Sequence, residues 1–371
     1  MKKIYLSLIV LFGMSSVMMA QTDQPAAVTA TPTDQPVVPA FKPSGKPIVT
    51  IFSDFTNSTT NSKTNNAFEL TRAYFGYGYN FSSDFSAKVV FDVANNAAAG
   101  TTTPGVSAFT VFAKNAYGEY NHGIVTADLG LVGENMFSLQ ESVWGKRYIY
   151  KSLQDQYGFG NSADLGAKVK LQFIPEVSLD MEVLNGEGYK KVQADSTFKF
   201  TVGLTVQPIK NLFARIYYDN MANQSFATSK VAQSSLNFFV GYKSEKGTLA
   251  VEYNTQNGKG NVKGQNWSGL SVYGTLPIVK QLNVFARLDD LSSDKLSVST
   301  TTNGVTTTTN LPWNSTKTGT DGLVYIAGVE FVPVKGIQIS PNFKYANPSS
   351  DASNAGAHSV SSINVNLGIN F

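Results

Sequence analysis

The last ten residues, Ser362–Phe371 (SINVNLGINF), decide how the fold is interpreted. Apolar residues alternate there with asparagine and glycine, at Ile363, Val365, Leu367, Ile369 and Phe371. Because successive side chains of a strand point to opposite faces, this alternation predicts a β-strand with one apolar and one polar face. A soluble β-sandwich can also end on such a strand, but a free terminal aromatic residue would be unusual on an exposed edge.

The pattern resembles the closing strand of Gram-negative outer-membrane β-barrels, in which a terminal aromatic residue is the usual assembly signal. The resemblance implies that Phe371 is this signal for the barrel-assembly machinery and lies in a periplasmic girdle of aromatic residues. It also implies that the last strand pairs with the first, expected at Ile48–Asn57, and closes the barrel. The expected location is the cell outer membrane, with outer-membrane lipid around the barrel.

The N-terminal residues have the arrangement of a secretory signal peptide. Lys2 and Lys3 precede an apolar run, Ile4–Val17, and cleavage is expected after Ala20, which makes residues 1–20 the signal peptide. The apolar run is too short to span a bilayer comfortably as a helix. Residues 21–47 are rich in Pro, Thr, Ala and Gln without periodicity, which predicts a disordered periplasmic linker before a barrel at 48–371.

Composition excludes several classes of protein. The 371 residues include no cysteine, so neither a disulfide framework nor a lipid-anchoring box is expected. Without Lys2 and Lys3, Lys+Arg falls from 29 to 27 against 26 acids, a net charge of +1 that predicts no nucleic-acid partner. No metal-ligand cluster, phosphate-binding loop or nucleotide motif is recognisable, so we expect no cofactor.

Alternating segments of about ten residues recur along the chain, as strands that cross a lipid bilayer require. Clear examples are Phe85–Val93, Leu165–Phe173, Phe198–Val206, Leu236–Tyr242 and Leu282–Leu288. In each, one face is apolar and the other mixes charged, hydroxyl and glycine residues. Because a soluble β-sandwich also alternates, the argument for a membrane depends on persistence of the pattern over the whole chain. No stretch after the signal is apolar enough for a membrane helix, so a chain in the membrane must be a closed barrel.

Short and long connections alternate between these segments. Short turns are expected near residues 82–84, 121–122, 174–176, 208–211, 244–247, 277–281 and 333–336. Long loops are expected near residues 57–66, 96–107, 133–163, 185–196, 220–233, 255–266, 290–322 and 346–360. Short turns usually face the periplasm and long loops face outside. The prediction is an all-β fold, a transmembrane antiparallel β-barrel of sixteen strands with both termini periplasmic and an aqueous lumen.

Strand phase assigns many charged side chains to this lumen. The expected cations are Arg72, Lys88, Lys114, Lys168, Lys170, Lys199, Arg215, Lys243, Arg287 and Lys344. The expected acids are Asp92, Asp180, Glu182, Asp219, Glu252, Asp289 and Glu330. An anion-selective pore needs rings or ladders of Arg and Lys, whereas this chain has four arginines in all. We therefore expect at most a mild anion preference and no tight phosphate site.

The third long loop, Glu134–Asn161, mixes aromatic residues with charges of both signs. A loop this long is usually functional or disordered, and this composition argues against disorder. Its run Trp144–Ile149 (WGKRYI) and Asp155, followed by Ser162–Gly166 and Asn185–Tyr189, resembles the porin family grouped with the phosphate-selective porins O and P. The resemblance implies a loop that folds inward and narrows the pore, with constriction residues Glu134, Glu141, Lys146, Arg147, Lys151 and Asp155. The alternative is an outward loop with self-paired charges.

The favoured function is a porin, not an enzyme, through which small hydrophilic solutes or ions diffuse passively. The resemblance also implies a homotrimer, although no distinct trimer patch is visible on the apolar strand faces. A barrel hydrolase is a second hypothesis, but His122 and His358 have no convincing catalytic partner in the sequence. A non-conducting adhesin or receptor is a third, with Thr300–Thr309 and Asn257–Gln265 as contact loops.

Overall fold

The computed structural model describes residues 41–95, 109–193, 196–222, 231–294, 296–302, 305–311, 321–349 and 358–371. The expected signal peptide (residues 1–20), most of the expected linker (21–47) and the expected loop at 96–107 lie outside these ranges. Within them, no helix is both long and apolar enough to cross a membrane.

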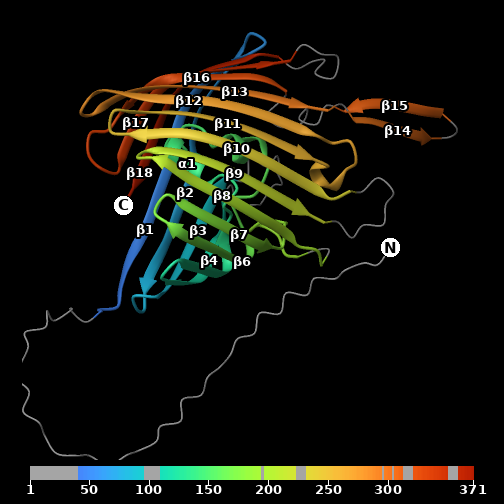
Figure 1. Cartoon of the computed structure of the whole chain (residues 1–371). Helices are drawn as coiled ribbons and strands as arrows, with labels where there is room; N and C mark the ends of the chain where they lie inside the picture. Colours follow the sequence, from blue (N-terminus) through green and yellow to red (C-terminus); the bar gives the residue numbers. More distant parts are fainter. Residues whose placement is uncertain are drawn as a thin grey trace, which may run out of the picture. The chain divides into compact units, whose positions relative to one another are not determined.

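Sixteen strands close into one antiparallel barrel (Figure 1). The barrel strands are β1 (Ser44–Thr60), β2 (Lys63–Asn80), β3 (Phe85–Asn95), β4 (Phe109–His122), β5 (Val125–Gly133), β6 (Ala163–Ile174), β7 (Val177–Leu184), β8 (Lys199–Ile209), β9 (Leu212–Met221), β10 (Gln233–Ser244), β11 (Gly247–Asn257), β12 (Trp267–Val279), β13 (Leu282–Ser293), β16 (Gly322–Phe331), β17 (Ile337–Pro348) and β18 (Val360–Asn370). Outside the barrel sheet, β14 (Leu296–Thr302) and β15 (Val305–Leu311) pair with each other. The short helical segments are α1 (Ser138–Trp144), α2 (Leu153–Tyr157) and η2 (Lys259–Asn261).

The last strand pairs with the first and closes the barrel, as predicted. The register of β18 on β1 runs from Thr50↔Asn370 to Thr60↔Val360. Phe371 continues this pairing by exchanging backbone hydrogen bonds of 3.1 and 3.0 Å with Val49. Strand β1 begins at Ser44, earlier than the expected Ile48, because the extended backbone continues through Pro47 opposite Tyr77.

The predicted count of sixteen barrel strands is confirmed, but two predicted connections are wrong in detail. No long loop occupies residues 57–66, because β1 and β2 remain paired as far as Thr60↔Lys63. Asn61 and Ser62 turn the chain with φ of 47° and 62°, the backbone of a tight two-residue hairpin. The turn expected at residues 121–122 lies instead at residues 123–124, after the end of β4.

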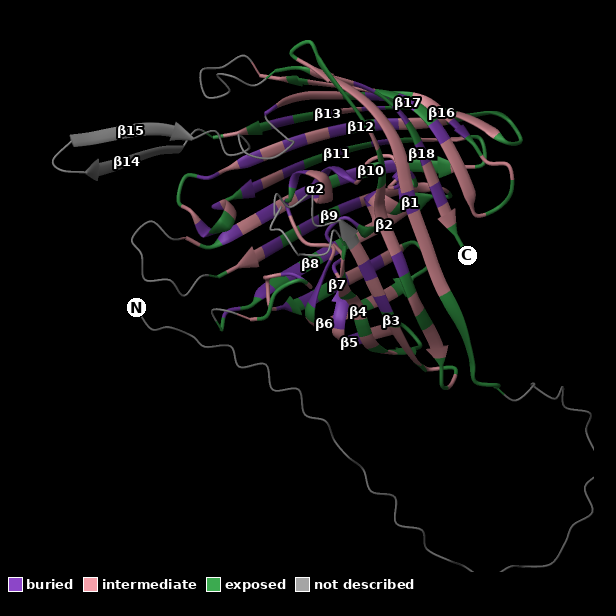
Figure 2. Cartoon of the chain, turned by 180° about the vertical axis from the view of Figure 1, so that it is seen from behind, coloured by how far each residue is buried: buried purple, intermediate pink, exposed green. Residues whose placement is uncertain are grey.

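Burial alternates along the strands because one face points outward and the other points into the lumen (Figure 2). In β10, Phe238 and Val240 are 44% and 47% exposed, whereas the intervening Phe239 is 2% exposed. The outward face of the barrel is therefore apolar and accessible, and a closed barrel with such a face is suited to lipid.

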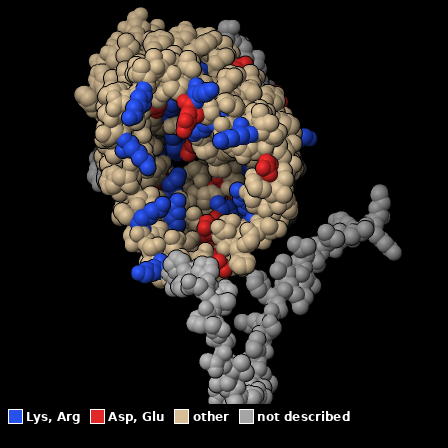
Figure 3. Space-filling model, turned by 60° about the vertical axis from the view of Figure 1, so that its left-hand side comes forward, with Lys and Arg blue, Asp and Glu red and all other residues tan. Residues whose placement is uncertain are grey.

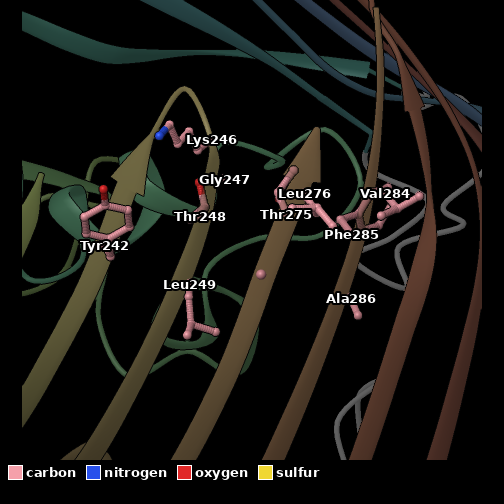
Figure 4. Close-up of a pocket in the computed structure, with 11 residues that line it drawn as sticks. Tyr242, Lys246, Gly247, Thr248, Leu249, Thr275, Leu276, Val284, Phe285 and Ala286 are labelled. Carbon is pink, nitrogen blue, oxygen red and sulfur yellow. The ribbon is translucent and has the colours of Figure 1, made fainter. Parts of the chain in front are cut away.

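The outer face also carries a groove of about 500 Å³ over β10–β13, close to the short turns (Figure 4). Leu249, Leu276 and Val284 line it from the outward phase of their strands, and Gly274 and Ala286 leave room between them. Because this groove faces outward, it is not part of the lumen.

A lysine on the outward face should destabilise the barrel strongly. Val89 lies near the middle of β3 on the outward face, beside the lumen-phase Lys88. We expect Val89→Lys to lower the free energy of unfolding in lipid vesicles by about 2–4 kcal/mol, since the ammonium would enter hydrocarbon. Urea unfolding measures the change, with Val89→Thr, which keeps the shape of valine without a charge, as the control. Equal stability of Val89→Lys and the unsubstituted protein would contradict the outward assignment.

Candidate functional site

The third loop, Glu134–Asn161, folds into the barrel between β5 and β6 and carries α1 and α2 (Figure 1). Each helix ends at a glycine in the left-handed conformation, Gly145 with φ of 66° and Gly158 with φ of 72°. Glycine adopts this conformation without a Cβ penalty, so it lets the chain reverse twice in a confined space. Residues of both helices pack against buried side chains of the inner wall, which favours the expected inward loop over an outward one.

An aromatic cluster on the inner wall holds the first half of the loop. Trp144 is 2% exposed and meets Tyr273 and Phe285 edge to face, with ring centroids 5.2 and 6.1 Å apart. Its indole Nε1 donates a hydrogen bond of 2.8 Å to the carbonyl oxygen of Tyr150, which folds the loop onto itself. Phe239 completes the cluster. This aromatic surface was not predicted from the sequence, although Phe239 and Phe285 occupy lumen-facing positions of β10 and β13 and could have indicated it.

A second apolar contact holds the other half of the loop. Leu153 and Phe159 are fully buried, and the Phe159 ring meets Trp267 at 5.2 Å. Gln154 Nε2 donates a hydrogen bond of 2.9 Å to Asn254 Oδ1 on β11. This half of the loop is thus fixed to β11 and β12.

The middle of the loop contacts the other side of the barrel, where Tyr148 packs with Phe52, Tyr74 and Val90. The Tyr148 hydroxyl also donates a hydrogen bond of 2.9 Å to Glu330.

Three of the expected constriction charges interact with the inner wall. Lys146 Nζ lies 3.1 Å from Glu330 Oε2, and both side chains are almost completely buried. Glu134 Oε2 lies 2.7 Å from Lys199 Nζ, again within a buried pair. Glu134 and Lys146 therefore anchor the beginning and the middle of the loop in this structure. The carbonyl oxygen of Lys151 accepts a 2.7 Å hydrogen bond from Arg287. The side chain of Lys151 lines a lumen cavity of about 290 Å³.

The remaining charges form a compact group on the loop surface that faces β1 and β2. Arg147 Nη1 contacts the carboxylates of both Glu141 and Asp155, and its Nη2 lies 3.5 Å from Tyr74 Oη. Lys151 Nζ is 3.6 Å from Asp155 Oδ1. Burial favours the neutral acid, but Arg147 and Lys151 outweigh it and lower the pKa of Asp155 to about 2. Asp155 therefore stays ionised at neutral pH.

Two cavities adjoin this group, and their linings share Phe52 and Arg147. The first, about 290 Å³, is also lined by Asp54, Glu69, Arg72 and Lys151. The second, about 390 Å³, is also lined by Thr50, Tyr74, Lys114, Ser162 and Lys168. Phe52 and Arg147 thus lie where the two cavities adjoin, one on the barrel wall and one on the loop.

About half of the expected lumen charges are paired with each other. Arg215 binds Asp180 through two bonds of 2.6 and 2.8 Å, and Arg287 binds Asp289 at 2.7 Å. The other pairs are Arg72–Asp92 at 3.4 Å, Lys168–Asp128 at 3.1 Å and Lys199–Asp219 at 3.5 Å. Lys88, Lys114 and Lys170 form no ion pair with any described residue. Figure 3 shows basic and acidic side chains around and within the hollow opening of the barrel.

His122, which had no recognisable partner in the sequence, forms a 3.0 Å contact with Asp84 in the neighbouring short turn. The pair is solvent-exposed, and Ser83 Oγ donates to Asp84 rather than to the imidazole. No nucleophile is therefore oriented toward the base here. Among the described residues, no cluster of His, Asp and Glu could hold a metal ion.

Comparison with solved structures shows the fold. Salmonella typhi OmpF, in a complex with daunomycin, matches with a TM-score of 0.63 at 10% identity, covering 88% of this chain and 97% of that chain. An anion-selective porin from Comamonas acidovorans matches with 0.62 at 7% identity, covering 89% and 100%. The outer-membrane channel DcaP of Acinetobacter baumannii matches with 0.58 at 14% identity, covering 90% and 99%.

The chain has the porin fold. No protein-family model and no curated protein sequence matches it. The closed sixteen-stranded barrel with an apolar outward face, together with this fold, places the protein in the outer membrane.

Removal of the indole should release the third loop from the wall. We expect Trp144→Ala to lower the local stability of the docked loop by about 3–5 kcal/mol, because both ring contacts and the bond to Tyr150 are lost. Hydrogen–deuterium exchange of peptides from residues 134–161 should then accelerate, while exchange in the barrel strands stays slow. Tyr253→Ala, which removes an outward ring on β11, is the control. Unchanged loop exchange in Trp144→Ala would contradict the anchoring role.

The loop charges should also make docking sensitive to acid. Because the pKa of Asp155 is lowered to about 2 from 3.8, its contribution is complete above pH 4 and is lost as the pH falls toward 2. The emission of Trp144, measured with Trp267 and Trp313 replaced by Phe, should shift as the pH falls below 4 and Asp155 is protonated. Asp155→Asn should weaken this dependence. A transition already complete at pH 5 would assign the effect to another group.

Proposed function

We propose that this protein is a porin through which small hydrophilic solutes and ions diffuse passively across the outer membrane, with Arg147 and Phe52 at its constriction. The observation that carries the proposal is the pair of cavities whose linings share these two side chains. A solute moving along the lumen would pass from one cavity to the other between the third loop and the wall formed by β1 and β2.

Apolar side chains dock the third loop on the wall, whereas its charged side chains lie beside the cavities, and this arrangement supports the path. Most of its aromatic and apolar side chains dock on β9–β13, where Trp144, Leu153 and Phe159 are buried. Its charged group, centred on Arg147, faces the opposite wall at Tyr74, beside the point where Tyr148 packs against Phe52. A loop that touches the opposite wall at one point and leaves cavities on both sides of it narrows a wide barrel without filling it.

The ion pairs argue for weak selectivity. All four arginines of the chain have carboxylate partners: Arg72 with Asp92, Arg147 with Glu141 and Asp155, Arg215 with Asp180, and Arg287 with Asp289. A neutralised arginine contributes little net field to a pore and has fewer free donors for a phosphate. Charged lumen residues of both signs lack an ion-pair partner among the described residues: Lys88, Lys114, Lys170, Lys243 and Lys344 against Asp54, Glu69, Glu182 and Glu252. This near balance supports at most a mild anion preference rather than phosphate selectivity.

Several finer features of this function stay predictions. They are cleavage after Ala20, periplasmic termini, Phe371 as the assembly signal and membership of the phosphate-selective porin group. A homotrimer is a further prediction, and one of the similar structures, OmpT of Vibrio cholerae, is described in a trimer form.

Removal of the Arg147 charge should change ion selectivity at the constriction. We expect Arg147→Gln to move the reversal potential under a salt gradient toward cation preference, because Glu141 and Asp155 lose their shared partner. Single-channel recording of the refolded chain in planar bilayers measures the shift. Lys246→Gln removes the same charge from an exposed turn and is the matched control.

Three outcomes are possible. A shift in Arg147→Gln alone supports the constriction. Equal shifts in both variants would mean that Arg147 does not lie on the ion path. A folded barrel that gives no conductance steps would overturn the proposed function and favour an adhesin or receptor.

A further inference from the structure

Lys114 lies at a β-bulge in β4, and its side chain points into the lumen. The register of β3 on β4 passes from Val90↔Asn115 to Phe91↔Ala113, so Lys114 has no partner residue on β3. A bulge of this kind inserts one extra residue and redirects a side chain, and bulges are frequent beside functional sites. Here the Lys114 side chain lines the 390 Å³ cavity next to the constriction.

The Lys114 ammonium contacts aromatic rings and a hydroxyl group but no carboxylate. Its Nζ lies 5.1 Å from the ring centroid of Tyr74 and 5.0 Å from that of Tyr189. It also donates a 2.8 Å hydrogen bond to Ser162 Oγ. Tyr189 is held in place by a 2.7 Å hydrogen bond to Asp92 on β3, so the loop between β7 and β8 contributes to the surroundings of Lys114.

The other charged residues that line this cavity are each engaged in an ion pair. Lys168 binds Asp128 at 3.1 Å, and Glu134 binds Lys199 at 2.7 Å. Arg147 binds Glu141. Lys114 is thus the one charged group of the lining without an ion-pair partner among the described residues. It leaves a single positive charge that a solute could neutralise.

We propose that this cavity is a binding subsite for small organic monocarboxylates, an assignment that rests on the proposed diffusion function. One carboxylate oxygen would accept a hydrogen bond from Lys114 Nζ, and the other would accept from the hydroxyl of Ser162 or Tyr74. Both hydroxyls accept bonds in the structure, from Lys114 and Arg147, and keep their own protons for donation. The apolar body of the solute would pack against Phe52 and Phe137, which line the same cavity.

The donor set fits a carboxylate better than a phosphate. A dianionic phosphate is bound best by several free arginine donors, whereas Arg147 already binds two carboxylates. Glu134 and Glu141 also line the cavity and would repel a second negative charge. One unpaired ammonium beside hydroxyls and aromatic rings matches one negative charge on a partly apolar molecule.

Benzoate is a suitable probe, and current block through the refolded full-length chain is the measurement. We expect benzoate added to a chloride solution to reduce the single-channel current in a saturable manner. Lys114→Gln should raise the half-blocking benzoate concentration at least about tenfold, the change that follows from losing about 1.4 kcal/mol of binding. Benzyl alcohol, with the same ring and no charge, and inorganic phosphate should both block much more weakly than benzoate.

Lys88→Gln is the matched control, because Lys88 is a second unpaired lysine of lumen phase that does not line the cavity. Equal loss of benzoate block in both variants would overturn the subsite and assign the effect to the general field of the lumen. Phosphate block equal to that of benzoate would overturn the carboxylate assignment. Normal conductance without benzoate block would refute the subsite alone, whereas a folded protein without conductance would refute the proposed function itself.

Discussion

The structure depends on pairing every strand edge, because unpaired backbone groups are costly in lipid. The pairing of β18 with β1 meets this constraint and turns sixteen strands into a barrel without an edge. Closure with this many strands has a second consequence, since the lumen becomes too wide for wall side chains to fill. A lumen of this width has room for an extra segment, and the third loop lies within it and narrows it.

The inner wall has two different surfaces as a result. On β10, β12 and β13 it carries Phe239, Tyr273 and Phe285, which bury Trp144 of the loop. On β1 to β4 it carries polar and charged residues beside the two cavities, together with Phe52, Tyr74 and Val90, which pack around Tyr148 of the loop. The lumen phase is therefore neither uniformly aqueous nor uniformly apolar. Arg147 faces Tyr74 on the β1–β4 side, where the two cavities of the proposed path lie.

The strands and the closure were predictable because alternation is a local property of the chain. The long loop expected at residues 57–66 was wrong because polar residues such as Asn57 and Thr59 also form a paired hairpin above the apolar belt. The site was less predictable, since its contacts join distant residues. Lys146 and Glu330 are 184 residues apart, and only the fold shows that this expected constriction charge is an anchor. Arg215 and Arg287 lie on the lumen-facing side of their strands, but their carboxylate partners determine how much net charge they contribute to the lumen.

Charge pairing changes how the lumen composition should be interpreted. A count of lumen cations against lumen acids treats each charge as equal, yet a buried pair such as Arg287–Asp289 presents almost no net field. Selectivity then depends on the few charges without partners and on where they lie. Lys114 is such a charge, and it lines a cavity beside the proposed constriction. One unpaired lysine can therefore matter more for solute choice than four neutralised arginines.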